Sequence, residues 1–145
     1  METKNLNTIW SKWIFGFSFI VIFAGIFLGI ILPFIIPQTP DLFLTEITGL
    51  SLSDLDPDLI RYQKLIMGVL GSTMIGWGII LAFLGYRLMQ KSEEWIWIAI
   101  TVSLIVWYIF DTSISLISGS FLNVILNFFF LVLPLPPLVV NVKDN

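Results

Sequence analysis

Long stretches without charged residues constrain this chain more than any other feature of its sequence. The first covers residues 13–36, which as an α-helix would extend roughly 36 Å, enough to cross a hydrocarbon core about 30 Å thick. Similar stretches follow at residues 65–89, 95–117 and 121–140, with at most one charged residue in each. The pattern predicts four transmembrane helices over these ranges.

The composition favours a lipid environment. Of the 145 residues, 57% are hydrophobic and only 12% are charged. A soluble domain of this length leaves roughly a third of its chain surface in contact with solvent, and a chain this apolar would have to expose hydrocarbon there. We therefore predict a single membrane domain over residues 1–145, an all-α transmembrane bundle in a plasma membrane or bacterial inner membrane.

The residue types that are missing exclude several kinds of chemistry. The chain has no cysteine and no histidine, which rules out thiolate chemistry and removes the commonest ligand of zinc and the commonest general base. A net charge of -3 and the lack of a basic patch argue against binding to nucleic acid. We expect no enzymatic activity, no metal site and no cofactor.

Basic residues in the connecting segments predict the orientation. Most of them fall on one side of the predicted spans, namely Lys4, Lys12, Arg87, Lys91 and Lys143, against Arg61 and Lys64 on the other. Because short basic loops stay in the cytoplasm, we expect both chain ends inside. The acidic segment 37–63 is then an external loop, and its apolar pattern is compatible with a short interfacial helix.

The fourth stretch differs from the others because it contains Pro134, Pro136 and Pro137. Proline lacks the amide donor of a helix and disrupts the turn before it. We expect the last part of residues 121–140 to be extended rather than helical.

Small residues four apart predict where the helices pack, because helices in lipid associate through close backbone approach. The first span offers Gly25 and Gly29, and the second offers Gly68, Ser72 and Gly76 in one row. We expect these two rows to form helix contacts. A membrane-protein partner or a second copy of the chain is an alternative occupant of the first row.

Asp111 is the charged residue within the third span, about 24 Å along the helix from Trp95 and thus in the outer half of the bilayer. A carboxyl group at that depth is costly unless it is protonated, paired or turned toward a polar interior. Residues at similar depth predict such an interior, and the expected cluster is Asp111, Ser115, Asn123, Asn127, Ser72 and Lys64.

Three interpretations of this cluster remain open. Its side chains can act only as interhelical hydrogen bonds that set the packing. They can line a pocket for a lipid or small amphiphile, or belong to a pathway for a small solute or proton. A further alternative is a structural subunit of a membrane complex. Membrane lipids are the expected partners in each case.

Alternating acids at Asp54, Asp56 and Asp58 also suggest a cation site, but the segment lacks the glycine and glutamate that complete a calcium-binding loop. We interpret it as a solvated acidic turn that caps a short helix.

The segments GVLGSTMIGWG (68–78) and WYIFDTSISLISGSFLNVILN (107–127) resemble a pattern of small prokaryotic membrane proteins with four predicted helices. The resemblance covers roughly residues 61–130. The resemblance implies a four-helix membrane bundle, and it does not imply any particular activity.

Overall fold

The computed structural model of the chain describes residues 2–36, 42–91 and 93–143, and the side chains of 9–36, 42–91 and 93–140. The elements in order are α1 (Glu2–Ile26), the π-helix η1 (Phe27–Ile35), α2 (Leu42–Thr48), the 3-10 turn η2 (Leu52–Asp54), α3 (Pro57–Gln90), α4 (Glu94–Ile117), α5 (Phe121–Val132) and α6 (Leu135–Lys143). Every regular element in the described residues is thus helical, which confirms the predicted all-α class.

Three helical segments are long and apolar enough to cross a membrane: Ile9–Ile35, Pro57–Gln90 and Glu94–Ile117. They correspond to the first three predicted spans. The helix Phe121–Val132 is apolar but shorter, at 12 residues or roughly 18 Å.

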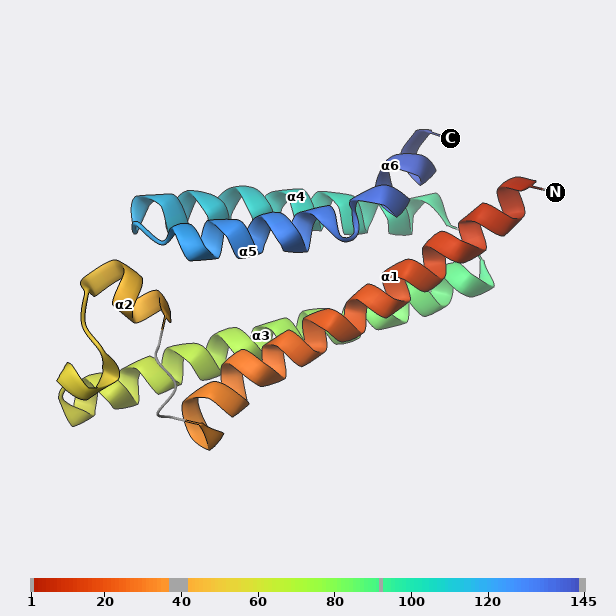
Figure 1. Cartoon of the computed structure of the whole chain (residues 1–145). Helices are drawn as coiled ribbons and strands as arrows, with labels where there is room; N and C mark the ends of the chain where they lie inside the picture. The colour runs from red at the N-terminus through yellow and green to blue at the C-terminus, as the bar shows by residue number, and fades with distance from the viewer. Residues whose placement is uncertain (1, 37–41, 92, 144–145) are drawn as a thin grey trace.

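The helices form two antiparallel hairpins (Figure 1). The continuous helix of α1 and η1 lies along α3, and α5 lies along α4. α1 begins and α6 ends at the same end of the molecule, which we call the terminal end, while α2 lies at the opposite end, the α2 end. The hairpins meet near the terminal end and diverge toward the α2 end.

The buried core explains this shape. Its members lie between Ile14 and Val21 on α1, in the halves of α3 and α4 next to the terminal end, and in α6: Ile14, Phe17, Val21, Leu81, Leu88, Ile96, Trp97, Ile100, Leu104 and Leu138. No residue of α3 or α4 in the half next to the α2 end belongs to this cluster among the described residues. The two hairpins are therefore held together by apolar contact at one end.

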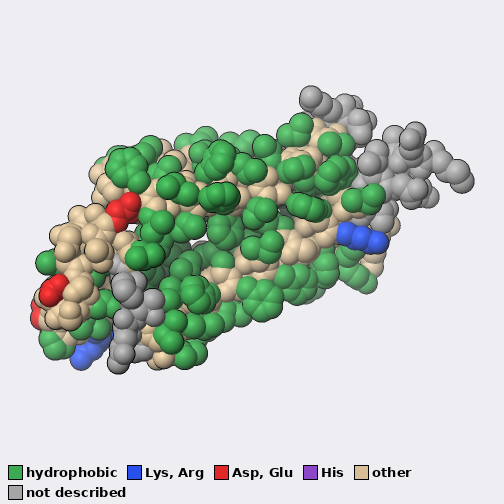
Figure 2. All heavy atoms as spheres, viewed as in Figure 1, with side chains coloured by type: hydrophobic (Ala, Val, Ile, Leu, Met, Phe, Trp, Pro, Cys, Tyr) green, Lys and Arg blue, Asp and Glu red, His purple; other side chains and the backbone are tan. Residues whose placement is uncertain are grey.

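The outer surface is apolar around the middle of the molecule. Figure 2 shows hydrophobic side chains over most of the visible face, with charged side chains toward the two ends. Many large hydrophobic residues are strongly exposed, such as Phe23 at 66% and Phe83 at 72%. Such a surface matches solvation by acyl chains.

A row of glycines lets α1 and α3 touch at backbone distance. The row consists of Gly71, Gly78 and Gly85, which face Gly29, Ile22 and Phe15 respectively. A Cβ on Gly71 would collide with backbone atoms of Gly25 and Gly29, and one on Gly78 would lie 2.6 Å from Cγ1 of Ile22. Each step of seven residues along one helix matches a step of seven along the other, so one face of α3 follows α1 over its length.

This contact corrects the expected row on α3. Gly25 and Gly29 do pack, but against Gly71. Ser72 is exposed, and a Cβ on Gly76 would meet open space. Gly68 is peripheral, since a Cβ there would lie 3.9 Å from the Gly29 carbonyl oxygen. The row at spacing four was wrong because the contact between α1 and α3 repeats every seven residues. In the structure α3 covers the Gly25 face, which was the alternative docking face for a partner.

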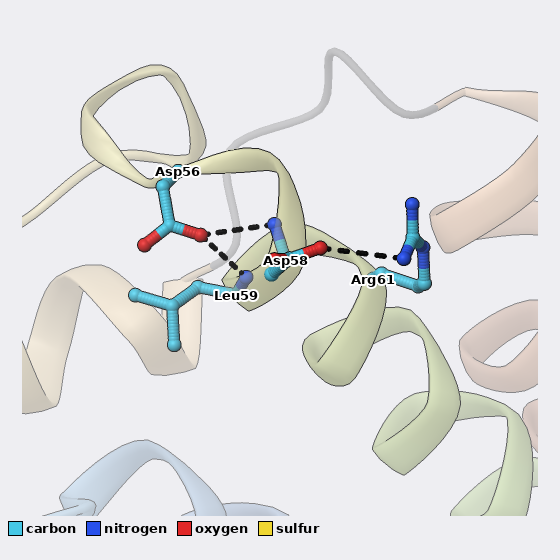
Figure 3. Close-up of polar contacts among 4 residues, drawn as sticks. All are labelled: Asp56, Asp58, Leu59 and Arg61. Carbon is cyan, nitrogen blue, oxygen red and sulfur yellow. Dashed lines mark hydrogen bonds and ion pairs between the residues drawn. The ribbon is translucent and has the colours of Figure 1, made fainter.

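The start of α3 lies before the apolar stretch that was expected to begin at residue 65. Asp56 caps the helix, accepting hydrogen bonds of 2.9 Å from the backbone amides of Asp58 and Leu59 (Figure 3). Pro57 occupies the first helical position, where its missing amide donor costs nothing. Asp58 forms an exposed ion pair with Arg61 at 3.3 Å. The acidic turn therefore caps a helix, as predicted, but the helix is the long α3.

The expected extended end of the fourth stretch is wrong, because residues 135–143 form α6. Pro136 and Pro137 stand in the first turn of this helix, where proline is tolerated. The break instead falls at Leu133 and Pro134, between α5 and α6.

Trp13 compensates for this break. In an unbroken helix the carbonyl of Leu133 would accept the amide proton of Pro137, which has none. The indole Nε1 of Trp13 donates to that carbonyl oxygen at 2.8 Å. A backbone acceptor that its own helix leaves without a donor is thereby satisfied from another helix.

Candidate functional site

The inward stripe of α4 changes character along its length. Trp97 and Leu104, seven residues apart, are about 1% exposed and belong to the core. The next position in this register is Asp111, which is half-buried, and Ser115 one turn later is 4% exposed. The stripe is therefore apolar near the terminal end and polar near the α2 end.

The stripe of α5 and α6 changes in the same way. Pro134 and Leu138 are buried near the terminal end, and Phe130 packs against the core. Asn127 is 3% exposed, and Asn123 one turn further is half-buried. The polar ends of the two stripes meet at the same depth.

Asp111, Ser115 and Asn123 form one hydrogen-bonded group. The Nδ2 of Asn123 donates to Oδ1 of Asp111 at 3.0 Å and lies 2.7 Å from Oγ of Ser115. The Ser115 hydroxyl donates to the backbone carbonyl of Asp111 at 2.7 Å. We call these three residues the polar cluster. Asn127 lies beside it, and its Nδ2 makes a long hydrogen bond of 3.4 Å to Oγ1 of Thr112.

The carboxyl group of Asp111 can accept more hydrogen bonds than it does in the structure. Its Oδ1 accepts from Asn123 and lies 3.4 Å from the Ser115 hydroxyl. Over the described ranges, no hydrogen bond reaches its Oδ2 and no lysine or arginine pairs with it. A carboxyl group has room for more partners than this. The polar cluster thus holds the α4–α5 hairpin together and still presents an acceptor.

Two residues of the expected site lie elsewhere. The Ser72 hydroxyl donates to the carbonyl of Gly68 at 2.7 Å on its own helix, and the side chain is exposed. The ammonium of Lys64 lies 5.9 Å from the ring centre of Phe34. Residue numbers set the depth of these side chains but not their direction around α3, which is why sequence reasoning joined them to the cluster.

The side of α3 that faces α4 is apolar. Met74 and Trp77 both pack against the core, and the Trp77 ring lies 5.8 Å from that of Trp107, with a tilt of 36°. Trp107 stands one turn before Asp111 on α4. The tryptophan pair therefore separates the apolar core from the polar cluster.

Glu46 joins α2 to the α4–α5 hairpin and was missed by sequence reasoning. Its carboxylate accepts from the Ser120 hydroxyl at 3.0 Å and from the backbone amide of Leu122 at 2.9 Å. Ser120 precedes α5 but makes no side-chain cap of its own, so Glu46 caps that helix across 76 residues of sequence. A cap supplied from so far away leaves no local pattern in the sequence.

Two acids outside the spans have lowered pKa values. The hydrogen bond from Trp95, followed by that from Arg87, lowers the pKa of Glu93, whose Oε1 lies 2.6 Å from the Arg87 guanidinium. Hydrogen bonds from the Ser51 hydroxyl and amide lower the pKa of Asp54. In the part of the chain that the structure describes, no three acidic side chains gather as a metal site would require.

Comparison of the chain with protein-family models, with curated proteins and with solved structures finds no match. The fold and the polar cluster are therefore the basis for a functional proposal.

Proposed function

We propose that the protein crosses a plasma membrane or bacterial inner membrane four times and binds a lipid or small amphiphile between its two hairpins. The fourth crossing would need α5 and α6 together, because the 12 residues of α5 are too short alone. This gives an even number of crossings and agrees with the position of both α1 and α6 at the terminal end (Figure 1). The basic residues favour the cytoplasm for that end.

The observation that supports binding is the meeting of two polar stripes where the hairpins diverge. Asp111 and Asn123 lie on inward stripes of α4 and α5, and the facing side of α3 is apolar. A headgroup that donates hydrogen bonds would donate to the Oδ2 atom of Asp111, while its acyl chain would lie along α3. The polar cluster also binds the two helices to each other, so packing and recognition use the same residues.

The apolar core favours binding over passage. Leu81, Ile100 and Leu104 are each about 1% exposed and fill the space between the hairpins on the terminal side of the tryptophan pair. A solute or proton pathway would have to pass through this packed region. The proposal accordingly involves no reaction and no transport step.

The test is retention of lysophosphatidylethanolamine, whose headgroup offers an amine donor, measured by native mass spectrometry on protein from nanodiscs. Asp111→Asn keeps an acceptor for Asn123 but replaces the other carboxyl oxygen by an amide nitrogen, and we expect about tenfold weaker binding, the loss of roughly 1.4 kcal/mol. Asn123→Leu should weaken binding as well.

Ser72→Ala is the matched control, because Ser72 lies at similar depth on an exposed surface. It should bind as the wild type does. Equal retention by wild type and Asp111→Asn, with both folded, would contradict the proposal and leave the polar cluster a packing device.

A further inference from the structure

An apolar groove lies on the outside of the molecule, away from the polar cluster. It has a volume of about 330 Å³ and runs along α1 beside the joint of α5 and α6. That is near the lower end of ligand pockets, roughly 300–1,000 Å³, and suits part of one chain of a lipid. Its lining residues are Lys12, Trp13, Gly16, Phe17, Ile20 and Leu133.

The groove is open beside Gly16, an exposed lining residue without a side chain. A Cβ placed there would meet no atom within 4 Å. The Trp13 ring is fixed in the lining by the hydrogen bond of its indole to the Leu133 carbonyl at 2.8 Å. The same bond that satisfies the proline break therefore also shapes this groove.

The groove has a cationic end and an apolar end. Its lining on α1 extends from Lys12 to Ile20, about 12 Å along the helix. Lys12 is exposed and lies in the first turn of the apolar segment Ile9–Ile35, at the depth of headgroups next to the terminal end. None of the lining residues is acidic.

We propose that this groove binds one acyl chain of an anionic phospholipid in the leaflet at the terminal end, with the lipid phosphate paired to the Lys12 ammonium. The charge of Lys12 selects an anionic headgroup over a zwitterionic one, and the open space beside Gly16 accepts the chain. A lysine beside an anionic headgroup contributes enough to favour binding about fivefold.

The experiment compares phosphatidylglycerol with phosphatidylcholine on the full chain in nanodiscs, and counts retained lipids by native mass spectrometry. Wild type should retain phosphatidylglycerol about fivefold more than phosphatidylcholine, and the preference should weaken at high salt. Lys12→Gln should abolish the preference. Gly16→Leu should reduce retention of both lipids, because the new side chain fills the groove.

Lys91→Gln is the matched control, since Lys91 is an exposed lysine at the same end but outside the groove. It should behave as the wild type. The proposal is overturned if wild type shows no preference, if Lys91→Gln loses it as fully as Lys12→Gln, or if Gly16→Leu retains lipid unchanged. Circular dichroism confirms that each variant is folded, and Asp111→Asn should leave this preference intact because its site is separate.

Discussion

Two glycines of α3, five residues apart, should respond in opposite ways to the same substitution. A Cβ on Gly71 would lie against backbone atoms of Gly25 and Gly29, which cannot move without separating the helices. A Cβ on Gly76 would meet open space. Alanine in a helix gains up to about 1 kcal/mol over glycine, whereas overpacking costs about 1–3 kcal/mol.

Gly76→Ala should therefore be neutral or stabilising by up to about 1 kcal/mol. Gly71→Ala should be destabilising by up to about 2 kcal/mol after the same gain is subtracted. The measurement is the free energy of unfolding of both variants in bicelles under an increasing fraction of denaturing detergent. If Gly71→Ala is at least as stable as Gly76→Ala, the close contact of the α3 glycine row with α1 is refuted.

Three other predictions test single contacts, and the first two of these contacts join distant parts of the chain. Trp13→Phe should lower the free energy of unfolding by about 0.6 kcal/mol. This cost should shrink in a Pro137→Ala background, which restores the missing amide donor. Equal costs in both backgrounds would show that Trp13 does not compensate for the proline. Glu46→Ala should speed hydrogen exchange at the Leu122 amide, whereas Glu46→Gln, which keeps an acceptor, should change it less; unchanged exchange in both would exclude the cap. The folded state lowers the pKa of Glu93, so this residue stabilises the fold at pH values above its unfolded pKa, about 4.3. That contribution is lost as the pH falls further, through the folded pKa. The melting temperature of a Glu93→Gln chain should therefore fall less in acid than that of the wild type.

The three long apolar helices were predictable because their length and hydrophobicity can be read directly along the chain. The structure has a helix over Glu94–Ile117 where residues 95–117 were expected. The start of α3 was missed because the cap at Asp56 and Pro57 lies in a polar segment, where an apolar pattern gives no signal. The helical α6 was missed because proline was treated as a breaker rather than as a residue of the first turn.

The site was predictable only in part, for a geometric reason. Asp111, Ser115 and Asn123 belong to helices joined by a short turn, so equal depth was enough to bring them together. Ser72 belongs to the other hairpin, and its direction depends on which face of α3 packs against α1. The row of glycines at a spacing of seven sets that face, whereas the row expected from the sequence consists of small residues four apart.

Side-chain amide NMR of Asn123 tests the central claim, that the polar cluster between the hairpins receives a headgroup. With ¹⁵N-labelled protein in nanodiscs, lysophosphatidylethanolamine should shift the Asn123 Nδ2 signal and saturate near one equivalent, and Asp111→Asn should weaken that response. An Asn123 signal that stays in place while the amphiphile demonstrably binds elsewhere on the protein would contradict the account.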